Sequence, residues 1–197
     1  MNSVYDLCSC NSGKKFKFCC YNVIKSSTTD TSAIAQLPLH TCSIRKDWQE
    51  LGMTNIAIAR KLPNNNFIVG IFLLDLWALG IKNVIFNRNM NQTDLYYLIQ
   101  SNASDQPITY EQARTLILGS LKYATTLGFS PHKDWNDAQC LIEPHREFDN
   151  TFTFGRKGKP FYYAGPYDTE HKSIIKKITA AGGDWIIPIK EEMLEIK

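Results

Sequence analysis

Residues 67–77, FIVGIFLLDLW, form the most apolar run of the chain and decide its fold. A turn-forming sequence, PNNN at residues 63–66, stands directly before the run. Such a run after a turn signal predicts a buried β-strand, with room for a bend at Gly70 or Asp75. Even when it is extended to Ile81, the run falls short of the roughly 20 apolar residues that span a bilayer. We therefore expect no membrane insertion.

The flanking segments predict an antiparallel meander with helices packed on it. Strands are expected at residues 55–62 and 82–86, and a short helix at residues 93–101. A longer helix should begin at the capping box of residues 109–112 and end at Gly128. That helix should lie on the sheet.

The C-terminal part predicts shorter elements in the order strand, strand, helix, strand. They are expected over residues 151–154, 161–164, about 168–181 and 184–189. The whole pattern predicts an α+β fold. Its main unit, residues 42–197, is expected to be a two-layer domain with a mainly antiparallel sheet and about three helices.

Composition and charge restrict the class of protein. The chain has 197 residues, of which 44% are hydrophobic and 21% charged, which excludes wholesale disorder, collagen and coiled coils. The N-terminus lacks the apolar run of a secretory signal, so we expect a cytoplasmic protein. Residues 1–25 hold four lysines against one aspartate, whereas the rest of the chain is neutral. Residues 26–41, rich in Ser and Thr, are expected to be a linker.

Four of the six cysteines lie close together near the N-terminus, at Cys8, Cys10, Cys19 and Cys20. Two short thiol pairs joined by a tight loop can supply the tetrahedral ligand set that zinc requires. The lysines between them, which are Lys14, Lys15 and Lys17, would offset part of the thiolate charge. The alternatives are unliganded buried cysteines or a vicinal disulfide. Cys42 and Cys140 stand alone and are expected to pack as small apolar residues.

Residues 8–20, CSCNSGKKFKFCC, resemble the SEC-C motif, the small zinc-binding module found at the C-terminus of the translocase motor SecA. The family pattern has Gly or Asn where this chain has Asn11, and Cys20 stands where the motor protein has His. The resemblance covers about residues 7–22. It implies one structural zinc ion on the four cysteines and a basic docking module. In the motor protein this module contacts an acidic chaperone and the ribosome, so such partners are what the resemblance implies here.

Asp75 is the most unusual polar residue of the remaining chain because it lies inside the apolar run. A buried carboxylate is costly unless it is paired, so cross-strand pairing with Arg60 or Lys82 is one interpretation. The other is a catalytic role. His132 and Asp134 lie on one loop and could form an acid–base pair, which together with Asp75 suggests a hydrolase or nuclease. A second pair of this kind is His145 with Asp149.

Residues 155–160, GRKGKP, form a basic turn that lacks the spacing of a Walker phosphate loop. Glycine and lysine are ordinary in a hairpin turn. Aromatic residues surround it, so Arg156, Lys157 and Lys159 could also contact single-stranded nucleic acid.

Two classes of function follow from these patterns. The first is a zinc-binding adaptor whose basic module docks on a protein or ribonucleoprotein partner. The alternative is the hydrolase or nuclease with an acid–base site around Asp75, His132 and Asp134.

Overall fold

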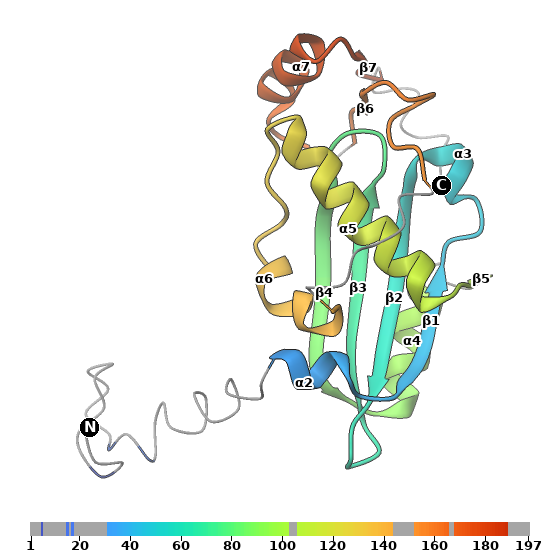
Figure 1. Cartoon of the computed structure of the whole chain (residues 1–197), viewed down its shortest axis with the longest axis vertical. Coiled ribbons are helices and arrows are strands. Elements are labelled where there is room, and N and C mark those ends of the chain that lie inside the picture. The colour runs from blue at the N-terminus through green and yellow to red at the C-terminus, as the bar shows by residue number, and fades with distance from the viewer. Residues whose placement is uncertain are drawn as a thin grey trace.

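The computed structural model in Figure 1 describes residues 31–102, 106–143, 152–165 and 168–188, together with the single residues Tyr5, Lys15 and Lys17. Six α-helices and one short 3-10 helix lie in these residues. The helices are α2 (Thr31–Ala35), α3 (Trp48–Leu51), α4 (Gln92–Ser101), α5 (Tyr110–Thr126), α6 (Trp135–Ala138), η2 (Gln139–Leu141) and α7 (His171–Ala180). The strands are β1 (Leu39–Ile44), β2 (Met53–Lys61), β3 (Phe67–Asp75), β4 (Gly80–Met90), β5 (Gln106–Pro107), β6 (Phe161–Tyr163) and β7 (Asp184–Ile186).

The main sheet has five strands in the order β4-β3-β2-β1-β5, and each neighbouring pair is antiparallel. Ile71 of β3 lies opposite Ala57 of β2 and Ile85 of β4. The prediction of an α+β fold with an antiparallel meander is confirmed. The apolar run of residues 67–77 supplies β3, which has a partner strand on each side.

The sheet is covered by helices on both faces, which differs from the two layers predicted. Figure 1 shows α5 crossing one face and α4 on the other. Side chains of β2 and β3 alternate between two hydrophobic clusters, one of which includes Leu116 of α5 and the other Leu95 of α4. A strand buried on both faces is apolar at successive positions rather than at every second one. The unbroken apolar run is therefore the signal for the third layer.

Helix α5 begins as predicted. The Thr109 hydroxyl accepts a hydrogen bond from the Gln112 N–H at 3.1 Å, and the Gln112 Oε1 accepts from the Thr109 N–H at 3.0 Å. The capping box satisfies two donors at the helix start and fixes where the chain turns onto the sheet. Helices α4, α5 and α7 have ten residues or more, and the other three are single turns.

The C-terminal elements form a small second sheet. Strand β6 pairs with β7 in parallel, with α7 between them in the chain. The predicted strand at residues 151–154 is wrong for its described part, because residues 152–154 form no strand. Phe154 instead stacks on Tyr123 of α5 at a centroid distance of 5.9 Å. Packing of this aromatic side chain against the helix takes the place of a hairpin.

Part of the predicted linker belongs to the folded body. Residues 31–35 form α2, and residues 39–41 begin β1, which pairs with β2. Ile34 is buried in the main core, so these residues contribute to the stability of the domain. Cys42 and Cys140 are buried free thiols, as expected. Every helix in the described part of the chain is too short or too polar to cross a membrane.

Gly52 provides a direct test of the packing at the end of the sheet. It closes α3 with a φ of 64°, and a Cβ atom there would overlap the indole ring of Trp77. We expect Gly52→Ala to lower the free energy of unfolding by about 2–5 kcal/mol, because the left-handed backbone and the clash both disfavour alanine. Urea denaturation measures the change. Gly182→Ala, whose Cβ would meet no neighbour although φ is also positive, separates the backbone cost from the clash.

Candidate functional site

A cavity of about 370 Å³ lies where the end of β3 meets α3, β6 and β7. We call it the aromatic cavity. Its apolar walls come from Leu51, Met53, Trp77, Phe161, Tyr163 and Ile186, and its charged residues are Glu50, Asp75 and Arg156. A cavity of this size can hold a small ligand or one large side chain of a partner protein.

Arg156 stands over two aromatic rings of this cavity. Its Cζ atom lies 4.5 Å from the Phe161 ring centroid and 5.4 Å from that of Trp77, and the two rings meet edge to face. The guanidinium group is solvent-exposed and has no carboxylate partner among the described residues. Stacking restricts the side chain while its N–H groups stay available for an anion.

The turn that carries Arg156 is anchored to the chain just after β3. The Gly155 N–H donates to the Leu76 carbonyl at 2.9 Å, and the Phe161 N–H donates to the Trp77 carbonyl at 3.2 Å. A Cβ atom at Gly155 would lie 2.6 Å from the Lys159 carbonyl oxygen, so only glycine fits. Arg156, Lys157 and Lys159 are all exposed, and we call them the basic turn.

Asp75 lines the aromatic cavity but is 5% exposed. Its Oδ1 accepts hydrogen bonds from the N–H groups of Trp77 and Ala78, both at 2.9 Å. Burial raises the pKa of the Asp75 carboxyl to about 6, although the Ala78 N–H, the Lys82 charge and the Trp77 N–H act in the opposite direction. The carboxylate therefore closes the turn between β3 and β4, and it titrates nearer to neutral pH than an ordinary aspartate.

Arg60 does not pair with Asp75. Arg60 of β2 lies opposite Ile68 of β3. Ile68 is seven residues before Asp75 in the same strand, so Arg60 and Asp75 are about 20 Å apart along the strand direction. Its guanidinium group donates to the carbonyls of Leu141 and Leu37 and lies over the Tyr110 ring. The predicted pairing with Arg60 is therefore wrong. Lys82 affects the Asp75 pKa through its charge but forms its ion pair elsewhere.

His132 and Asp134 lie together on the segment before α6. The His132 Nδ1 is 3.7 Å from an Asp134 carboxylate oxygen, and both side chains are partly exposed. The His132 N–H donates to the Ile81 carbonyl and so continues the edge of β4. Neither side chain is hydrogen-bonded or ion-paired to Asp75, whose described bonds stay within its own turn. The pair forms, but without a bond to the third predicted residue.

A polar network that the sequence did not reveal holds the C-terminal elements to β4. Asp168 accepts from the Lys82 ammonium group at 2.9 Å, from the Tyr162 hydroxyl at 3.1 Å and from the Gly165 N–H at 2.9 Å. The Tyr162 hydroxyl also lies 2.7 Å from the His171 Nδ1. Burial would raise the pKa of Asp168, but the Lys82 ammonium, Gly165 and Tyr162 outweigh it and lower the pKa. Burial and the nearby Asp168 carboxylate raise the pKa of the Tyr162 hydroxyl.

Exposed apolar side chains gather around the aromatic cavity. Leu51, Tyr163 and Ile186 line it and are 37% to 44% exposed. Trp185 and Ile187, the neighbours of Ile186 in the chain, are equally exposed. A group of large exposed apolar residues of this kind is typical of interaction surfaces.

The four predicted zinc ligands, Cys8, Cys10, Cys19 and Cys20, lie outside the described residues, as do Lys14, His145 and Asp149. Among the residues that are described, no group of three or more His, Cys, Asp and Glu side chains could hold a metal ion. Lys17 donates to the Tyr5 hydroxyl at 3.2 Å, and its ammonium group lies over the same ring.

A scan against protein-family models, a search of curated proteins and a search of solved structures each found no match to this chain. The resemblance of residues 7–22 to the SEC-C motif stays a prediction.

Proposed function

We propose that the protein is a zinc-binding adaptor that docks on an acidic protein partner. In this proposal, the SEC-C-like module of residues 1–25 and the basic turn of the body bind the same partner. An acidic chaperone is the partner class that fits best, and the ribosome is the second.

The observation that supports the proposal is the position of the basic turn beside the aromatic cavity. Arg156 lines a hollow whose rim exposes Leu51, Tyr163 and Ile186, and Lys157 and Lys159 are exposed on the same turn. Interfaces commonly combine buried aromatic anchors with arginine, and a cationic rim attracts an acidic surface. An acidic segment with one large apolar side chain satisfies both parts of this site.

The charge distribution of the chain supports the same partner. The body after residue 25 is neutral, so the excess positive charge comes from the N-terminal lysines. The basic turn adds a second, local concentration of positive charge on a neutral domain. Two separate basic groups, joined through one chain, increase affinity for an acidic partner by raising the effective concentration of the second contact.

The four N-terminal cysteines provide a donor set that suits zinc. Thiolates are soft ligands, and four of them leave no open position for a water nucleophile, so the metal would be structural. A segment this short has little core of its own, and the metal would supply its folding free energy.

Metal analysis tests the zinc module. We expect one zinc ion per full-length chain, and none in a version that lacks residues 1–25. Cys19→Ser should lower zinc occupancy and also weaken binding to an acidic chaperone, because the module unfolds without metal. Cys42→Ser, which replaces a buried thiol of the body, should retain zinc. Metal retained after the truncation contradicts the proposed ligand set.

Binding measurements with purified partners test the adaptor function. The full chain is titrated with an acidic chaperone and, separately, with bacterial ribosomes in a sedimentation assay. Saturable binding to either partner that weakens in Cys19→Ser supports the proposal. If the body binds RNA and residues 1–25 contribute nothing to either partner, the adaptor function is wrong.

A further inference from the structure

Strand β7 has an open edge in the small second sheet. The Asp184 N–H donates to the Pro160 carbonyl at 3.0 Å, and the Ile186 carbonyl accepts from the Ala164 N–H at 2.9 Å. Asp184 and Ile186 therefore direct their main-chain groups toward β6, and Trp185 between them directs its own away from β6. Within the described part of the chain, neither main-chain group of Trp185 is hydrogen-bonded. A free N–H and carbonyl at a strand edge can pair with another strand.

The opposite edge of the small sheet faces the body of the domain. The Phe161 N–H of β6 donates to the Trp77 carbonyl, at 3.2 Å. A sheet of two short strands is marginally stable, and a third strand adds hydrogen bonds and apolar contacts to it. The side on which the small sheet can grow is therefore that of β7.

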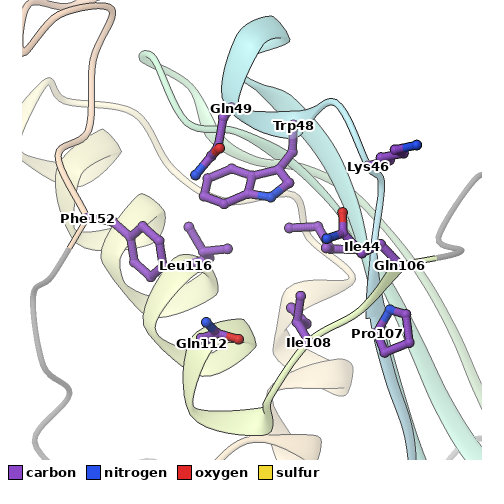
Figure 2. A pocket seen from close by; sticks show the side chains of 10 residues that line it. All are labelled: Ile44, Lys46, Trp48, Gln49, Gln106, Pro107, Ile108, Gln112, Leu116 and Phe152. Atoms are coloured by element: carbon purple, nitrogen blue, oxygen red, sulfur yellow. The ribbon is translucent and has the colours of Figure 1, made fainter.

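Both edges of the main sheet carry features that discourage such pairing. Strand β5 is only two residues long, and Figure 2 shows that it includes Pro107, which has no N–H to donate. Strand β4 carries the exposed polar side chains of Arg88 and Asn89, and the Ile81 carbonyl already accepts from the His132 N–H at 2.9 Å. Short strands, proline and charged side chains are common protections of a sheet edge.

The edge of β7 has no such protection. Trp185, Ile186 and Ile187 follow one another, and each of these large apolar residues is 44% to 45% exposed. Because successive side chains of a strand point to opposite faces, apolar surface is exposed on both faces of β7. An open apolar edge of this kind promotes aggregation unless another strand covers it. We therefore expect this edge to be covered in the functional complex.

One face of the small sheet forms a wall of the aromatic cavity. Tyr163 of β6 lies opposite Ile186 of β7, and both line the cavity together with Phe161. A strand added at β7 would place every second side chain on this face, next to Ile186. Arg156 lines the same cavity, and its exposed guanidinium group lies 4.5 Å from the Phe161 ring centroid. This combination of an apolar hollow and a cation favours an acidic segment that carries an apolar side chain.

We propose that the partner binds as an extended acidic segment that adds a strand to the open edge of β7 and places one large apolar side chain at the aromatic cavity. The inference rests on the proposed function for the acidity of the partner. It adds the conformation of the bound segment and the main-chain groups that hold it. Main-chain pairing would supply affinity, and the cavity and the basic turn would select the side chains.

N-methylated peptides test the strand addition without changing the protein. The probe is a short peptide of glutamates with one central phenylalanine, titrated into the full chain by isothermal titration calorimetry. Alternate residues of a strand present their N–H groups to opposite sides, so methylating one alternate set of amides should block pairing with β7 and methylating the other set should not. We expect one methylated peptide to bind as the unmodified peptide does and the other to bind at least about tenfold more weakly. Equal affinities of the two methylated peptides, or no binding of the unmodified peptide at millimolar concentration, overturn the proposal.

A matched pair of substitutions at Trp185 tests the same edge with the acidic chaperone. Trp185→Pro removes the outward N–H, whereas Trp185→Val removes the indole and keeps the N–H, and neither removes a hydrogen bond between β6 and β7. We expect Trp185→Pro to bind the chaperone at least about tenfold more weakly than Trp185→Val does. If the two variants bind equally, strand addition is wrong although an acidic partner still docks. If the wild type binds neither the chaperone nor the peptide, the proposed function fails as well.

Sedimentation velocity of the full chain tests the competing occupant, a second copy of the chain paired through β7. We expect the wild type to remain monomeric at high protein concentration. Self-association that is lost in Trp185→Pro and kept in Trp185→Val assigns the edge to a second copy and overturns the proposal.

Discussion

Replacing Asp168 by alanine should lower the free energy of unfolding by about 3 kcal/mol at neutral pH, because it leaves the Lys82 ammonium group largely buried without a partner. The side chains of Lys82 and Asp168 are only 15% and 12% exposed. The substitution also removes the acceptor for the Gly165 N–H and one partner of the Tyr162 hydroxyl. These bonds join β4, β6 and the segment before α7, so the loss should appear as a cooperative change in urea denaturation.

A double-mutant cycle tests the cause of this loss. Lys82→Met in the Asp168→Ala background removes the unpaired charge, and we expect it to restore part of the lost stability. Asp168→Ala should also make stability less dependent on pH in the acid range. The pKa of Asp168 is lowered on folding, so its carboxylate stabilises the fold above the ordinary pKa of an aspartate, and this contribution is lost as the pH falls. If Lys82→Met destabilises the double mutant further, the ion pair is not the source of the effect.

Asp75 affects the pH dependence of stability in the direction opposite to Asp168, and replacing it by asparagine should remove that effect. The pKa of Asp75 rises from 3.8 to about 6 on folding, so its contribution is most favourable below pH 3.8 and is lost as the pH rises through about 6. The corresponding free energy is about 3 kcal/mol. Asparagine keeps an oxygen for the two N–H groups of the turn but carries no charge.

We therefore expect Asp75→Asn to be about 2 kcal/mol more stable than the wild type at pH 7.5 and close to it at pH 4.5. Urea denaturation at the two pH values measures this difference. Asp134→Asn, the same substitution at a half-exposed position on the loop before α6, serves as the control. An identical pH dependence in wild type and Asp75→Asn contradicts the account of the buried carboxyl.

The fold was predictable from local signals wherever one segment determines its own structure. The capping box at Thr109 fixes the start of α5, and the turn before Phe67 fixes the start of β3. The third layer was not foreseen: the unbroken apolar run of β3 is its signal, but the sequence does not show which helix covers the second face. Strands β6 and β7 pair in parallel because α7 connects them and returns the chain to the side of β6. The sequence of neither strand shows this pairing.

The site was predictable only in its residue types. The unusual position of Asp75 and the basic residues of the turn were apparent in the sequence, and the structure places Asp75 and Arg156 on the same cavity. Asp75 and Arg156 share this cavity because the chain after β3 is hydrogen-bonded to the basic turn and β6, about eighty residues further along the sequence. The partners of Lys82 and Arg60 were not predictable for the same reason, because both depend on distant C-terminal segments.

The central claim is that the basic turn and the aromatic cavity bind an acidic partner, and a matched pair of charge reversals tests it. One variant carries Arg156→Glu, Lys157→Glu and Lys159→Glu. The control carries Lys122→Glu, Lys172→Glu and Lys176→Glu, which are exposed positions on α5 and α7 and give the same net charge. The Kd of each full chain for the acidic chaperone is measured at fixed ionic strength. The account predicts at least about tenfold weaker binding for the first variant and little change for the control; equal weakening in both would contradict it.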